Sequence, residues 1–142
     1  MVLHKTNQGN IQFNADTRVM DVAFEGFMSA KEFRDFMTTG LNLLTKKLQE
    51  GNVLWLADTR NHKVVKKEET DWVAQFWTPE AKKAGLTHIA FIVPKDVFAE
   101  MSVTNYQKQA QNVGGILIKN FDDPKKAVSW YLESVQNPAL KS

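Results

Sequence analysis

Two periodicities in the placement of apolar residues predict most of the secondary structure. Between residues 33 and 48 the apolar positions recur every three or four residues, which is the spacing of one face of an amphipathic α-helix. Ser29 and Glu32 precede this stretch as a capping-box pair, and Gly51 follows it as a terminating residue. We therefore predict a helix between them, with close packing at Gly40 in its middle.

Short apolar runs predict the strands. They occupy residues 2–4, 11–13, 19–24, 53–57, 87–93 and 116–118. A polar turn at residues 14–17 joins the second and third runs as a β-hairpin. The run at residues 53–57 has no polar alternation, as expected of a central strand that is covered on both faces.

Three more segments are predicted to contain helices. Residues 66–77 form the first, which the following Thr-Pro pair restarts or kinks. Residues 96–112 hold a short turn and then a helix that the following Gly-Gly pair ends. The last helix has Asp123 as its N-cap and Pro124 as its first residue. Strands that alternate with helices predict an α/β fold with a mostly parallel sheet and right-handed crossovers.

The composition argues against several classes of protein. The 142 residues include 18 basic and 16 acidic side chains, and a formal net charge of +2 does not favour nucleic acid as a partner. The absence of cysteine excludes disulfides and thiolate catalysis. The three histidines lack metal-binding spacing, so we predict no metal and no cofactor. The N-terminus has no signal-peptide pattern and no apolar run approaches the roughly 20 residues of a membrane span. We therefore expect a cytoplasmic protein without integral membrane association.

Five stretches carry a family resemblance: Trp55-Leu-Ala-Asp58-Thr-Arg60, Trp72, Trp77-Thr-Pro79, residues 89–94, and Phe121-Asp-Asp-Pro-Lys-Lys-Ala127-Val-Ser-Trp130. Through them the chain, from about Gly9 to Leu132, resembles the SpoIIAA-like family of the STAS-like group, also described as STAS/SEC14-like. The resemblance implies a single STAS-like domain over residues 1–142. Its mixed, mostly parallel sheet would have about four or five strands, an N-terminal β-hairpin and about four helices packed mainly on one side. It also implies a non-enzymatic binding role.

Polar residues directly after the central strand form the first candidate site: Asp58, Thr59, Arg60 and Lys63. Ligands of open α/β sheets bind beyond the carboxyl ends of the strands, so these residues predict an anion site or the rim of a partner surface. The alternative is a solvated loop in which Asp58 and Arg60 pair with each other. In phosphorylated STAS proteins an Asp-Ser pair lies at this place. Asp58-Thr59 matches it, but the Ser-Gly continuation is replaced by Arg60-Asn61, which weakens a phosphoswitch hypothesis.

Aromatic residues of the next helix form the second candidate site: Trp72, Phe76 and Trp77. Five residues of an α-helix advance about 500°, so Trp72 and Trp77 are predicted to lie about 140° apart. A helix covered on both sides would bury both indoles in the core. Otherwise one of them lines an apolar pocket or a dimer contact.

The sequence thus predicts a binding module and not an enzyme, because it shows no G-x-S-x-G elbow and no H-E-x-x-H motif. Its site would lie near the C-terminal end of the central strand and engage a partner protein, a second copy, or a small apolar or anionic ligand. The alternative is a SEC14-like carrier of a lipid or other hydrophobic metabolite. That carrier would have a cavity lined by Trp72, Phe76 and Phe91, with residues 98–101 as a lid.

Overall fold

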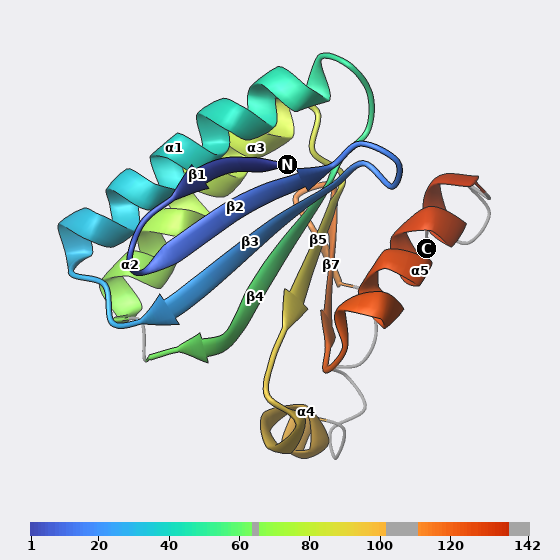
Figure 1. Ribbon diagram of the computed structural model, residues 1–142. Coiled ribbons are helices and arrows are strands. Elements are labelled where there is room, and N and C mark those ends of the chain that lie inside the picture. Colours follow the sequence, from blue (N-terminus) through green and yellow to red (C-terminus); the bar gives the residue numbers. More distant parts are fainter. Residues whose placement is uncertain (64–65, 102–110, 137–142) are drawn as a thin grey trace.

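The six apolar runs and a further short segment pair into one mixed sheet of seven strands in the order β1-β2-β3-β4-β5-β7-β6 (Figure 1). The computed structural model describes residues 1–63, 66–101 and 111–136. The strands are β1 (Val2–Lys5), β2 (Gly9–Asn14), β3 (Val19–Gly26), β4 (Leu54–His62), β5 (His88–Ile92), β6 (Gln111–Val113) and β7 (Ile116–Phe121). The sheet exceeds the four or five strands predicted because β1 and β6 add an antiparallel strand at each edge.

The centre of the sheet is parallel, as predicted: β3, β4, β5 and β7 pair in parallel, and β1, β2 and β6 run antiparallel to their neighbours. The predicted helix over residues 102–110 lies outside the described residues, but its expected end at Asn112 belongs to β6. Gly114 and Gly115, at φ +60° and +95°, form the turn of a β6–β7 hairpin. The prediction that they terminate a helix is therefore wrong. A pair of glycines fits both structures, because β-hairpin turns also require positive φ.

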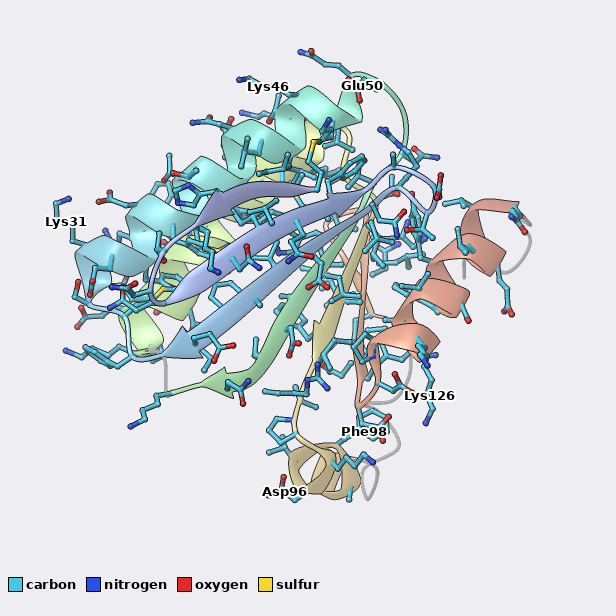
Figure 2. All side chains as sticks on the ribbon, in the orientation of Figure 1. Lys31, Lys46, Glu50, Asp96, Phe98 and Lys126 are labelled. Carbon is cyan, nitrogen blue, oxygen red and sulfur yellow. The ribbon has the colours of Figure 1, made fainter. Side chains whose placement is uncertain are left out.

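Helix α1 (Ala30–Leu48) begins with the predicted capping box: the Glu32 amide donates to Ser29 Oγ and the Ser29 amide donates to Glu32 Oε1. Its apolar stripe covers one face of the sheet, while Lys31 and Lys46 point away from it (Figure 2). A Cβ at Gly40 would lie 2.7 Å from the ring of Trp55 on β4. The predicted close packing at this glycine is therefore confirmed.

A continuous helical segment lies beside α1 on the same face of the sheet, and it consists of α2 (Lys67–Trp72), η1 (Val73–Trp77) and α3 (Thr78–Lys83). The middle part, η1, is a π-helix in which the Thr78 amide donates to the Val73 carbonyl, five residues back. Pro79 follows at once and has no amide hydrogen to donate. We call the side of the sheet that carries this segment and α1 the paired-helix face.

The opposite side of the sheet carries α5 (Pro124–Gln136), which packs over β4, β5 and β7, and we call it the α5 face (Figure 1). Asp123 caps α5 as predicted, since its Oδ1 accepts from the Lys125 amide. A short helix, α4 (Lys95–Met101), follows β5 at the end of the sheet (Figure 1). Helices thus cover both faces, the paired-helix face more fully.

Strand β4 supplies core residues to both faces, as its unbroken apolar run predicted. Trp55 and Ala57 lie in the cluster on the paired-helix face, whereas Leu54 and Leu56 pack with Tyr131 and other residues of the α5 face. All four are at most 2% exposed. The polar half of this same strand provides the candidate functional site.

Candidate functional site

Strand β4 does not end at Ala57, as the sequence predicted, but continues to His62. Its pairing with β5 stops at Asp58, opposite Ile92, and the residues beyond pair only with β3. One free edge exposes these last residues to water, which explains why they are polar although they belong to a strand. The expected polar loop from Asp58 to Lys63 is therefore mostly strand.

Asp58 and Arg60 lie on the α5 face and neutralise each other. Arg60 Nη2 and Nε lie 2.7 and 2.9 Å from the two oxygens of Asp58, so the guanidinium is engaged through two nitrogens. Burial alone would raise the pKa of Asp58, but the hydrogen bonds and charge of Arg60 prevail and hold it below the usual value. Asp58 is partly buried and structurally engaged, and its pairing with Arg60 matches the alternative to an anion site.

Thr59 points to the opposite, paired-helix face, because successive side chains of a strand alternate between faces. Its hydroxyl donates to the Ile92 carbonyl of β5 over 2.9 Å. Asp58 and Thr59 therefore do not form one site, although they are adjacent in sequence.

A β-bulge in β4 places His62 on the paired-helix face as well. Between the pairs Ala23–Asp58 and Glu25–Asn61, β3 advances two residues and β4 advances three. Without this extra residue, strict alternation would put His62 on the side of Arg60. The imidazole instead packs against Phe24 and Phe33, with ring centroids 5.1 and 6.3 Å away.

A cavity of ≈ 320 Å³ lies between this half of β4 and the helices of the paired-helix face. Residues of strands β3 to β7 line it on the side of the sheet, and residues of α1 and the α2–η1–α3 segment line it on the other side. Its described lining residues are Phe24, Phe33, Met37, Trp55, Ala57, Thr59, His62, Thr70, Val73, Ala74, Trp77, Thr78, Ile89, Phe91, Val113 and Ile118. Hydroxyl and imidazole groups come only from three threonines and His62 within this set, so the cavity is strongly apolar.

The π-helix η1 shapes one wall of this cavity. Its i to i+5 hydrogen bonding places residues five apart about one turn from each other. Trp77 lies in the paired-helix cluster and the partly buried Trp72 packs against it, whereas a regular α-helix would separate the two by about 140°. Trp77 is 2% exposed, packs on Trp55 with the ring centroids 4.7 Å apart and the planes tilted by 57°, and donates from Nε1 to the Met37 carbonyl.

Of the predicted binding residues, the structure brings only Thr59 and Trp77 together at the cavity. Trp72 is half-buried beside Phe33 and Arg34, outside the lining, and Phe76 is 60% exposed. Lys63 is exposed just after β4. Of the lining predicted for a carrier, Phe91 is present, whereas Trp72, Phe76 and the described side chains of α4 do not line the cavity.

Residues that the sequence interpretation missed complete the site. Ala57 and Ala74 are small residues whose spacing gives no signal, but they leave room on the floor and at the rim. His62 also borders a second hollow of ≈ 150 Å³, which we call the side pocket and whose wall includes Phe27, Lys66 and Glu69. No local pattern in the sequence reveals the bulge that turns His62 toward this side of the sheet.

A hydroxyl–imidazole cluster lies on the α5 face. His88 Nε2 lies 2.7 Å from Ser134 Oγ, and Nδ1 lies 2.7 Å from Thr87 Oγ1. His88 and Ser134 are 0% and 2% exposed. Because no substrate reaches such atoms in the folded chain, this cluster is a structural polar network in the core.

Among residues 1–63, 66–101 and 111–136, no three His, Asp or Glu side chains gather in a way that could hold a metal ion. None of the helices in that part of the chain is both long enough and apolar enough to cross a membrane. No protein-family model, curated protein or solved structure matches the chain.

Proposed function

We propose that this chain is a non-enzymatic binding module that holds a small, mostly apolar ligand in the cavity between η1 and the C-terminal half of β4. The cavity itself carries the proposal: it measures ≈ 320 Å³ and apolar side chains form nearly all of its described lining. Small-molecule sites are typically concave, apolar hollows of about 300–1,000 Å³ with a few placed polar groups.

The size of the cavity sets the size of the ligand. An apolar cavity of about 150 Å³ accepts benzene. A cavity of ≈ 320 Å³ has about twice that volume, so it suits a ligand of roughly two fused rings or a short branched chain. A long acyl chain would extend beyond it.

This proposal develops one of the sequence alternatives, the carrier of a hydrophobic metabolite, and retains Thr59 and Trp77 as binding residues. An anionic ligand at Arg60 has less support, because that guanidinium already binds Asp58 through two nitrogens. The SpoIIAA-like resemblance, a partner protein and a homodimer remain predictions, and exposed Phe76 is the first residue to change in testing a protein contact.

A titration with 2-methylnaphthalene, an apolar fluorophore of two fused rings, tests the proposal. Ala74 lies at the rim of the cavity, so a phenyl ring in Ala74→Phe would occupy the entrance and weaken probe binding about tenfold or more. Its neighbour Gln75 is exposed and does not line the cavity, so Gln75→Phe adds the same ring outside and is the matched control. Equal binding by the wild type and both variants would place the probe elsewhere and contradict the proposal.

Native mass spectrometry of protein purified from cells gives an independent test. The proposed function predicts a co-purifying small molecule on the wild type and on Gln75→Phe, but less of it on Ala74→Phe. A ligand retained equally by all three proteins would not occupy this cavity.

A further inference from the structure

The chain uses an irregularity in a central strand to place one histidine among apolar side chains. The bulge in β4 turns His62 away from the charged pair on the α5 face and into contact with Phe24 and Phe33. Bulges are over-represented beside active sites, where they re-aim a side chain. The π-helix in the facing wall is a second irregularity of a kind found often at functional sites.

His62 has unused hydrogen-bonding capacity at this position. Its Nδ1 is buried and has no hydrogen-bond partner among the described residues. A buried polar atom without a partner destabilises the protein that contains it, and such atoms in native proteins usually have a specific role. The ring borders both the cavity and the side pocket, so a ligand in the cavity lies beside it, and the χ2 torsion of histidine has a broad range over which Nδ1 can turn.

The surroundings of His62 favour an uncharged partner. Burial lowers the pKa of this imidazole, so the ring is neutral near pH 7 and one of its nitrogens is an acceptor. Of the charged residues in the side pocket, Glu69 is already bound by Arg34 at 2.7 and 3.3 Å, and Lys66 is exposed to water. A charged ligand group between the two phenyl rings would lose its hydration without a buried countercharge.

We propose that the ligand of this cavity carries one uncharged hydrogen-bonding group, such as a hydroxyl or an amide, which pairs with Nδ1 of His62 while its apolar body fills the space beside η1. The inference rests on the proposed function and adds the chemical class of the ligand. It assigns His62 as the residue that distinguishes an apolar alcohol from the corresponding hydrocarbon.

A matched series of two-ring probes tests this assignment: naphthalene, 2-naphthol and 2-naphthoate, each titrated by calorimetry at pH 7.5. The wild type should bind 2-naphthol about tenfold more tightly than naphthalene, because one buried unpaired group gains its hydrogen bond. 2-Naphthoate should bind more weakly than 2-naphthol. His62→Phe should bind naphthalene as well as the wild type does but lose the preference for 2-naphthol.

Two controls separate this effect from a loss of folding. His4 is another partly buried histidine that packs on a phenylalanine, Phe36, but it does not line the cavity, so His4→Phe should keep the full preference. The second control uses the wild-type protein alone. The nitrogen NMR signals of its His62 ring should shift when 2-naphthol binds but not when naphthalene binds.

The outcomes distinguish the two proposals. Equal binding of naphthalene and 2-naphthol, or an unchanged preference in His62→Phe, overturns the role of His62 and leaves the cavity proposal intact. Tightest binding of 2-naphthoate overturns the uncharged group and indicates an anionic one. Failure of all three probes to bind overturns the proposed function and this inference with it.

Discussion

Asp58 and Thr59 are neighbours in β4, yet they lie in opposite environments. On the α5 face Asp58 and Arg60 neutralise each other, and their side chains remain 19% and 43% exposed. On the paired-helix face Thr59 is satisfied by a backbone carbonyl and stands beside a cavity with an apolar lining. A charged pair that is complete by itself has little left for a ligand, whereas unfilled apolar space can gain contacts from one.

The two faces also differ in regularity. The α5 face carries an uninterrupted α-helix over alternating strand residues. The paired-helix face combines the bulge at the end of β4 with the π-helix η1 in the facing wall. Both of these irregularities border the cavity in which we place the ligand.

The largest difference should come from truncating the cavity wall at Trp77. Trp77→Ala removes a side chain that is 2% exposed together with its hydrogen bond to Met37, and it should cost about 3–5 kcal/mol of unfolding free energy. Phe76→Ala removes an adjacent ring that is 60% exposed and should change stability by less than about 0.5 kcal/mol. Urea denaturation measures both, and equal losses would contradict the placement of the two rings.

Replacing one alanine on each face by leucine should change the unfolding free energy differently on the two faces. Ala57 lies on the cavity floor, and Ala90 is fully buried in the α5-face cluster. Ala90→Leu should cost about 1–3 kcal/mol through overpacking. Ala57→Leu should range from neutral to a gain of about 1–2 kcal/mol, because the added carbons enter existing apolar space. A similar loss in both variants would mean that the cavity cannot accommodate extra atoms.

A smaller effect is expected at the charged pair. Arg60→Met should cost about 0.2–1 kcal/mol at neutral pH, since the Arg60 side chain is 43% exposed and water screens the pair. The folded-state pKa of Asp58 lies below its usual 3.8, so between these two values the unfolded chain binds more protons and stability falls as the pH falls. Arg60→Met removes the main lowering influence and should flatten this acid limb below pH 3.8.

Asp21 lies near the same pair, and its effect on the pH dependence of stability has the opposite sign. The contributions of Asp21 and Asp58 must therefore be measured separately. Loss of hydration and the charge of Asp58 raise its pKa above 3.8, against the attraction of Arg60. Between 3.8 and the raised value the folded chain binds more protons, so this residue makes stability fall as the pH rises. The fall in unfolding free energy below pH 3.8 should therefore be measured in Asp21→Asn, with and without Arg60→Met. An unchanged slope would show that the Asp58–Arg60 pair does not stabilise the fold.

The smallest effect should come from the titration of His62, which water partly screens. Burial lowers its folded-state pKa below 6.5, so in the window just below that value the unfolded chain binds more protons and stability falls as the pH falls. His62→Phe should remove this slope, whereas His4→Phe should not. Thermal unfolding between pH 5 and 8 measures the difference, and a slope that persists in His62→Phe would come from another group.

The sequence predicted the elements whose signals are local. The capping box of α1, the unbroken apolar run of β4, and Asp123 before Pro124 each depend on a few neighbouring residues, and all are present. The end of β4 was misjudged because its last residues pair with β3 alone, and one free edge permits polar side chains inside a strand.

The cavity could not be predicted in the same way, because it depends on space between distant segments. Residues of β4 and η1, the small Ala57 and Ala74 among them, line the same hollow, and no pattern within either segment reveals that they share it. The π-helix could not be predicted from the sequence either. A regular helix with 3.6 residues per turn separates Trp72 from Trp77, whereas the wider turn of η1 lets both pack on the same side. The bulge reverses the orientation of His62 through a single inserted residue.

The most direct test of a ligand site beside η1 is to locate a bound probe by intermolecular nuclear Overhauser effects, with 2-naphthol and methyl-labelled protein. Contacts should appear to the methyl groups of Ala57, Val73 and Ile118, which line the cavity. They should be absent for Val128 and Leu132, which pack on the α5 face. Contacts confined to the α5 face, or none to the three cavity methyl groups at saturating probe, would contradict the account.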